Sequence, residues 1–237
     1  MIELIEHRPS KYREIFVDDL KTIKATFESN IGRSDRLLDW VDSDHQLTAQ
    51  LSHPETPATE VVRWSLVNAV SAMDTFFRQF VSCVDTMIAL GAPTSVGTVM
   101  SAEATSVTFD ASILKVLYGP DEDLLLKYRA MKLVCHQSLE RTVFQNSDKI
   151  FNELASRSLF KFSVLVRDKK TRIALKANVD AAIDRRNKIV HRGDEAYDLA
   201  QELAPFQLID AKGQIDSIRT FVNIYYVRSS ALVFNYC

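Results

Sequence analysis

Apolar residues recur every three or four positions along most of this chain, and this spacing constrains the fold more than any other feature. Only six glycines and six prolines interrupt the 237 residues, so the periodic stretches are long. A 3.6-residue repeat with few breakers indicates amphipathic helices packed against one another. The sequence therefore predicts an all-α protein. Its hydrophobic fraction of 46% and charged fraction of 25% are ordinary for a globular domain.

Residues 1–55 are expected to form a helical extension that packs on the rest of the molecule. Ser10 can cap a helix that runs to about Glu28. The pair Ile31-Gly32 is expected to break this helix, and a short helix over 37–41 follows. Residues 56–237 then form the main helical domain, and the two parts are expected to make one compact unit.

The main domain begins with the longest helix that the sequence predicts. Thr56 is its expected N-cap, Pro57 occupies the first turn, and Gly91 follows the last residue, Leu90. A Ser/Thr-rich stretch over 93–108 is expected to be a loop or a weak helix. Later helices are expected over 110–118, 121–139, 149–156 with Ser147 and Asp148 as the cap, about 170–192, and 210–233.

The helix that begins near Lys170 ends with the segment 185–194, whose sequence is RRNKIVHRGD. At 3.6 residues per turn, Arg186 continues the apolar stripe of Val179 and Ile183. A guanidinium is rarely tolerated in such a stripe unless it is paired or functional. Arg186 is therefore the first candidate for a functional residue.

Asp184, Asn187 and His191 follow one another at +3 and +4 spacing on an adjacent face of the same helix. An acid, an amide and an imidazole therefore project together beside Arg186. Two interpretations stay open on spacing alone. Arg186 could form an internal ion pair with Asp74 or Asp184 while His191 interacts with the helix dipole, or these side chains could form a site.

The segment that contains Arg186 and His191 resembles the signature of the HEPN superfamily, a group of all-helical proteins. That signature is an Arg, four to six residues and a His, often with Asn, Asp or His directly after the Arg, as Asn187 is here. A second segment, RTVFQNSDKI at 141–150, is similar to the lead-in of the RiboL-PSP-type branch. There an FQ-x-[SP]-[DE]-[KN]-I stretch precedes the motif helix. The resemblance covers roughly residue 57 to the C-terminus.

The resemblance implies a fold and an activity. The fold is a HEPN-like bundle with two long antiparallel central helices, the 57–90 helix and the motif helix, plus the N-terminal extension. The activity is metal-independent cleavage of single-stranded RNA by attack of the 2′-hydroxyl, at a composite site formed across a homodimer. Such enzymes commonly act as toxins or defence effectors, so an antitoxin or regulatory protein is an expected partner. No metal or cofactor is expected.

The resemblance also implies roles for individual residues. His191 is expected to act as general acid or base, because its ordinary pKa is near 6.5. Arg186 is expected to contact the phosphate through its bidentate guanidinium, and Asn187 to orient the phosphate or the imidazole. Asp74 and Asp184 are expected to support them. Three further cations are candidates for RNA-backbone binding, with solvated surface charges as the alternative: Arg185, Lys188 and Arg192.

Asp74 is chosen because it belongs to a polar line on an otherwise apolar helix. Asn68, Ser71, Asp74 and Arg78 follow one another at +3, +3 and +4. In HEPN proteins this helix packs against the motif helix, and a polar position on it often faces the Arg and the His. Asp74 would then orient Arg186 or His191. The alternative is a stripe that faces solvent.

Charge is distributed unevenly along the chain. Between residues 141 and 192 there are thirteen Lys and Arg against five Asp and Glu, a local net charge of +8, although the whole chain carries −2. This basic segment could attract a polyanion to one side of the molecule. It could equally be a pair of solvated basic helices balanced by acidic neighbours.

Other function classes have little support in the sequence. Cys83, Cys135 and Cys237 are too few and too scattered for a disulfide framework or a zinc site. The most apolar run, 76–90, is too short and too charged to span a bilayer, and residues 1–13 do not resemble a signal peptide. We therefore expect a cytoplasmic protein without membrane contact.

Two functional hypotheses from different classes follow from the sequence. The first is a HEPN-type endoribonuclease. The second is a non-catalytic HEPN module that serves for dimerisation or as a scaffold for a partner protein or RNA, because a motif does not guarantee turnover. A sequence-specific DNA-binding protein is disfavoured, since no helix-turn-helix spacing stands out.

Overall fold

The computed structural model describes residues 11–51, 56–90, 116–117, 123–139, 144, 146–156, 162–191 and 208–236, without the side chains of 88, 156, 191 and 228–236. Every regular element in these ranges is a helix. The all-α prediction is therefore confirmed for the described part of the chain. The expected Ser10 cap, the stretch 93–108 and nearly all of the helix expected over 110–118 lie outside it.

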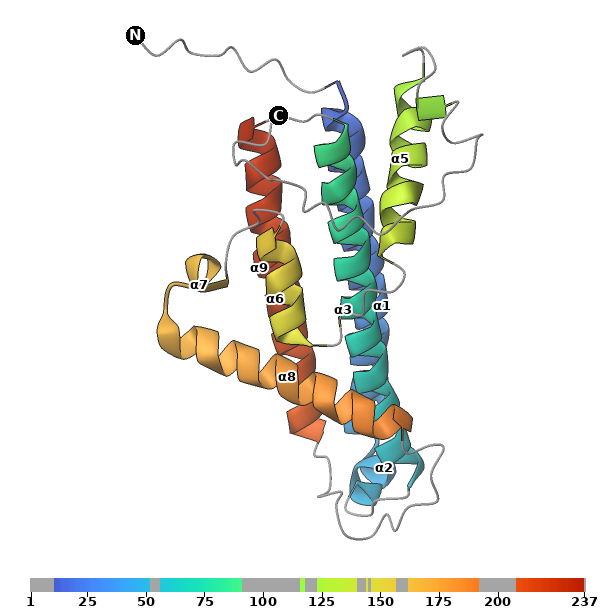
Figure 1. Cartoon of the computed structure of the whole chain (residues 1–237). Helices are drawn as coiled ribbons and strands as arrows, with labels where there is room; N and C mark the ends of the chain where they lie inside the picture. The colour runs from blue at the N-terminus through green and yellow to red at the C-terminus, as the bar shows by residue number, and fades with distance from the viewer. Residues whose placement is uncertain are drawn as a thin grey trace.

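Two long antiparallel helices form the spine of the molecule. Helix α1 (Arg13–Ser43) leads through the short helix α2 (His45–Gln50) into α3 (Pro57–Ala89), which returns along α1 (Figure 1). The expected start of α3 is confirmed, because the Thr56 carbonyl accepts the amide of Glu60 at 3.0 Å and its hydroxyl contacts the amide of Thr59 at 3.4 Å. These contacts satisfy donors of the first turn that the helix itself cannot satisfy.

The break expected at Ile31-Gly32 is wrong, because α1 is continuous through it. Its buried positions keep a three- and four-residue spacing on both sides of the glycine: Phe16, Leu20, Ile23, Phe27, Ile31, Ser34, Leu38 and Val41. A glycine inside a helix costs about 1 kcal/mol relative to alanine. Burial of several large side chains on either side stabilises the helix by more than that. The short helix expected over 37–41 is part of α1.

Helix α9 (Leu208–Tyr236) packs against both α1 and α3 and completes the central bundle. An aromatic cluster joins the elements: Phe27 contacts Phe76 at 5.5 Å between ring centroids, and Phe77 contacts Phe221 at 5.4 Å. Because α1 contributes to the same hydrophobic core as α3 and α9, residues 13–43 are an integral part of the bundle. Within the described ranges, no helix is long and apolar enough to cross a membrane.

Two shorter helices lie beside the spine. Helix α5 (Leu124–Ser138) flanks one end of the α1–α3 pair (Figure 1), and its first turn is capped by Asp123, which accepts the amide of Leu126 at 2.8 Å. Helix α6 (Ser147–Ser156) is capped by Asn146, whose side-chain oxygen accepts the amide of Asp148 at 2.8 Å. The expected cap of Ser147 with Asp148 is therefore one residue late.

The helix with the motif is α8 (Lys169–His191), which follows the single turn α7 (Phe162–Leu165). It packs against α9 and α3 through Leu175, Val179, Ala182 and Ile183. Figure 1 shows α8 crossing α3 at a steep angle near the end of α3 that follows α2. The resemblance had implied that these two helices run side by side and antiparallel. In this structure α1 and α3 form the long antiparallel pair.

Candidate functional site

Arg186 lies where the apolar stripe of α8 leaves the core. Val179 and Ile183 are buried, whereas Val190, the next position of the stripe, is 37% exposed. The Arg186 guanidinium is half-buried, and its Nη1 donates a hydrogen bond to the Asn187 Oδ1 at 3.0 Å. Its Nε is buried and has no hydrogen-bond partner among the described residues. A charged group is thus partly removed from water with one donor left unsatisfied, which is an expensive arrangement unless it serves a ligand.

No carboxylate of the described residues forms an ion pair with Arg186. Asp184, two residues before Arg186 on α8, is exposed. The internal ion pair with Asp74 or Asp184, which was one interpretation of the sequence, is therefore absent from the described part of the molecule. The Arg186 guanidinium therefore has no carboxylate counter-charge among the described residues at this end of α8.

Asp74 takes part in a different set of contacts. Its Oδ1 accepts the amide of Phe144 at 2.9 Å and its Oδ2 accepts from Arg78 at 3.3 Å, while Arg78 also donates to the Leu139 carbonyl at 2.9 Å. Asp74 and Arg78 thereby hold the chain between α5 and α6 on α3. The structure does not bring Asp74 to Arg186. The expected solvent-facing stripe holds only for Asn68 and Ser71, which are exposed.

A second cation stands beside Arg186 on α8. Arg185 is half-buried, and burial lowers the pKa of its guanidinium, with the charge of Arg63 on α3 acting in the same direction and Asp210 on α9 opposing it. Arg63 also pairs with Glu60 in the first turns of α3. Arg63 and Arg185 are far apart in sequence and become neighbours only because α8 crosses α3. Sequence reasoning missed Arg63, and no local signal could have found it.

The remaining residues of the motif are only partly described. The helical backbone of α8 extends to His191, one turn beyond Asn187, but the His191 side chain lies outside the described residues, as do Arg192 and Gly193. Lys188 is exposed. The structure therefore brings together Arg185, Arg186 and Asn187, and leaves the position of the imidazole undescribed.

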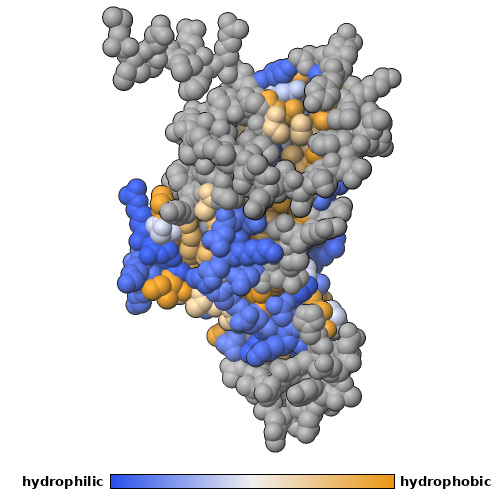
Figure 2. Space-filling view, in the orientation of Figure 1, coloured by the Kyte–Doolittle hydropathy of each residue, from blue (hydrophilic) through white to orange (hydrophobic). Residues whose placement is uncertain are grey.

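The basic segment is partly neutralised where it packs against α6. Lys176 forms ion pairs with Asp180 at 2.6 Å and with Asp148 at 3.3 Å. Hydrogen bonding to these carboxylates raises the Lys176 pKa, although partial burial of the ammonium acts in the opposite direction. Figure 2 shows a mainly hydrophilic face over α8, interrupted by smaller hydrophobic areas. Excess positive charge is therefore concentrated toward the two ends of α8.

Among the described residues, no group of three or more His, Cys, Asp or Glu side chains is placed to hold a metal ion. In comparisons with protein-family models, curated proteins and solved structures, nothing matches this chain. The resemblance to the HEPN superfamily therefore rests on the two sequence segments, 141–150 and 185–194.

Proposed function

We propose that this protein is a metal-independent endoribonuclease of the HEPN type that cleaves single-stranded RNA. The observation that supports this most is the state of Arg186. Within the described part of the chain, its half-buried guanidinium meets no carboxylate and its Nε has no acceptor. A phosphate oxygen would supply both the missing acceptor and the missing negative charge.

Charge around Arg186 supports the same proposal. Arg185 and Arg63 repel each other across the α3–α8 crossing, while Asp210 acts in the opposite direction on Arg185. An RNA backbone at this place would relieve the repulsion and bind more tightly at low salt. Lys188, exposed one residue beyond Asn187, adds a further positive charge on α8.

The proposed chemistry is transesterification. A base takes the proton of the 2′-hydroxyl, the 2′-oxygen bonds to phosphorus while the bond from phosphorus to the 5′-oxygen breaks, and an acid gives the leaving oxygen its proton. His191 is assigned to proton transfer, Arg186 to the charge that develops on the phosphate, and Asn187 to holding Arg186 in place. The products are a 2′,3′-cyclic phosphate and a 5′-hydroxyl.

One chain supplies one motif histidine, whereas the reaction needs both a base and an acid. We therefore place the active site across a homodimer in which two α8 ends meet. Val190 on α8 is partly exposed and Ile209, at the start of α9, is 73% exposed. These side chains give the α8 end an apolar surface that a second copy could cover. An antitoxin or another regulatory partner would act by blocking this end.

The same exposed side chains favour the second candidate function, a non-catalytic dimerisation or scaffold module. The two functions differ in turnover alone. A scaffold would form the dimer and bind a partner or RNA without cleaving it.

The test is cleavage of a mixed cellular RNA pool by the purified chain in EDTA. Arg186→Ala and His191→Ala should each lower the rate at least 100-fold, as expected when a transition-state contact or a proton-transfer group is lost. Arg167→Ala, which removes an exposed arginine just before α8, is the matched control and should cleave like wild type. Absence of cyclic-phosphate ends, or equal rates in all four proteins, would exclude the enzyme and leave the scaffold.

A further inference from the structure

The α1–α3 pair carries both tryptophans of the chain on its surface. Trp40 on α1 and Trp64 on α3 are each 53% exposed. Tryptophan is usually well buried, and an exposed indole offers a large apolar face together with one hydrogen-bond donor. Two exposed indoles on one helix pair indicate a binding surface.

The two indoles lie at the same level of the antiparallel pair. Phe27 on α1 contacts Phe76 on α3, with 5.5 Å between ring centroids. Trp40 lies 13 residues after Phe27, and Trp64 lies 12 residues before Phe76. At about 1.5 Å of rise per residue, the two positions differ in height by only about 1.5 Å.

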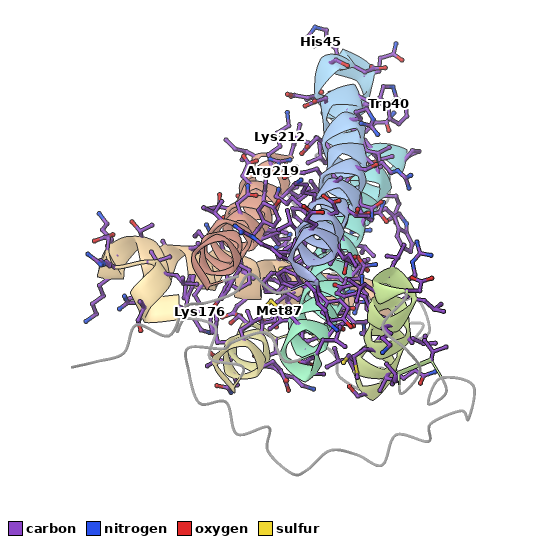
Figure 3. All side chains as sticks on the ribbon, turned by 90° about the horizontal axis from the view of Figure 1, so that it is seen from above. Trp40, His45, Met87, Lys176, Lys212 and Arg219 are labelled. Carbon is purple, nitrogen blue, oxygen red and sulfur yellow. The ribbon has the colours of Figure 1, made fainter. Side chains whose placement is uncertain are left out.

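Both tryptophans are on the side of the pair where α5 packs, beyond the end of α5. Ser82 of α3 donates to the Lys132 carbonyl of α5 at 3.2 Å, so it marks the side of α3 on which α5 packs. Trp64 is 18 residues before Ser82, which is five helical turns, so the two residues face the same side of α3. Figure 3 shows Trp40 projecting from α1 away from α9. Figure 1 shows that α5 covers only the other end of the α1–α3 pair.

Two arginines continue the surface along α1. Arg33, Arg36 and Trp40 follow one another at +3 and +4 and are all exposed, so they form one stripe. Within the described part of the chain neither arginine has an ion-pair partner. The opposite flank of α1 is different, because Asp35 and Asp42 there pair with Arg219 and Lys212 of α9. The stripe is therefore positively charged and unneutralised.

The platform lies near the level at which α8 crosses α3. Trp64 is next in sequence to Arg63 on α3, and Arg63, which pairs with Glu60, lies close enough to Arg185 on α8 to affect its pKa. The exposed indole of Trp64 is therefore at the part of α3 that α8 reaches (Figure 1).

We infer that Arg33, Arg36, Trp40 and Trp64 form a platform for a single-stranded nucleic acid, on which bases stack against the indoles while the arginines contact phosphates. This platform would hold the strand whose neighbouring phosphate reaches Arg186, so the inference rests on the proposed ribonuclease function. Stacking accepts any base, and cations follow the backbone, which is the combination that single strands require. A second copy fits less well, because a twofold contact would oppose arginine to arginine.

The test is a titration of the full chain with a mixed-sequence deoxyoligonucleotide of 12 nucleotides, followed by tryptophan fluorescence. This probe has no 2′-hydroxyl, so it cannot be cleaved by the proposed reaction. Because both tryptophans are on the platform, binding should quench the emission. Trp40→Ala and Trp64→Ala should each weaken binding about tenfold. The logarithm of the association constant falls as the logarithm of the salt concentration rises, and the double variant Arg33→Gln/Arg36→Gln should make this dependence less steep by about 1.4.

Arg129→Gln, which removes an exposed arginine of α5, is the matched control and should bind like wild type. Equal affinities in wild type and the tryptophan variants, or no quenching by the oligonucleotide, would overturn the platform. Emission that changes with protein concentration alone, together with loss of self-association in Trp40→Ala, would assign the surface to a second copy. None of these outcomes depends on RNA cleavage, so the cleavage assay with Arg186→Ala tests the proposed function separately.

Discussion

Partly buried charges are paired at the α5 end of the bundle and unpaired, among the described residues, at the end of α8. Where α5 packs, Lys132 donates to both carboxylate oxygens of Asp19 at 2.5 and 2.6 Å, Tyr128 donates to Asp19 at 2.8 Å, and Cys83 lies 3.2 Å from the Tyr128 hydroxyl. Every member of this group has a partner. At the end of α8, among the residues that the structure describes, Arg186 has one neutral partner and its buried Nε has none.

The difference separates a structural group from a binding group. A charge that is paired and hydrogen-bonded fixes the helices that carry it, here α1, α3 and α5. A charge that is partly desolvated and unpaired lowers stability until a ligand supplies the missing contact. The first kind should therefore respond to mutation in stability and the second in activity.

Asp19→Asn should have the largest effect on stability, a loss of about 2 kcal/mol. The substitution leaves Lys132 without its counter-charge, and the cost is below that of a fully buried pair because both side chains keep some contact with water. Asp18→Asn is the matched control, since Asp18 pairs with Lys21 in an exposed position and should contribute less than about 0.5 kcal/mol. Urea unfolding followed by circular dichroism compares them, and equal midpoints would remove the structural role of Asp19.

Asp74→Ala tests whether Asp74 is a structural residue or supports RNA cleavage. Loss of its bonds to Phe144 and Arg78 should cost about 1–2 kcal/mol of unfolding free energy and leave RNA cleavage by the folded protein unchanged. Thr75→Ala, at the neighbouring exposed position, is the control and should change neither the unfolding free energy nor RNA cleavage. The reverse pattern for Asp74→Ala, with normal stability and lost cleavage, would mean that Asp74 orients Arg186 or His191 after all.

Alkaline pH should weaken the α5 end in particular. Burial raises the Cys83 pKa, and the charge of Asp19 raises it further; burial also raises the Tyr128 pKa. Groups with raised pKa contribute stability that is fully present below their unfolded values, about 8.5 for a thiol and 10 for a phenol, and that is lost as pH rises. The stability advantage of wild type over Cys83→Ala should therefore shrink above about pH 8.5. A constant difference between pH 7 and 10 in urea unfolding would contradict this.

Periodicity and capping residues predicted most helices, because each signal is local. Thr56 and Pro57 marked the start of α3, and its end fell one residue from the expected Leu90. The wrong predictions arose where a local signal competes with tertiary packing or with a second local signal of equal strength. Gly32 breaks an isolated helix but not one held by buried residues on both sides, and Asn146 and Ser147 are equally good caps until the backbone selects one.

The candidate site was predictable to a smaller extent. The spacing placed Arg186 in line with the apolar stripe of Val179 and Ile183, and in the structure it lies half-buried where that stripe leaves the core. The partners of the polar residues were not predictable, because they depend on how helices cross: Arg63 reaches Arg185, and Asp74 binds the amide of Phe144, 70 residues away. A pattern identifies which side chains share a face, while tertiary packing decides what they meet.

Arg186→Met should have the smallest effect on stability and the opposite sign to Asp19→Asn. Methionine keeps an unbranched apolar stem in line with the apolar stripe and removes a half-buried charge whose Nε has no partner among the described residues, so unfolding free energy should stay level or rise by up to about 1 kcal/mol. Cleavage should be lost in the same protein. Arg129→Met, at an exposed position of α5, is the control and should change neither quantity much. A clear loss of stability in Arg186→Met would mean that the guanidinium is a structural partner, and the contrast between the two ends of the bundle would then disappear.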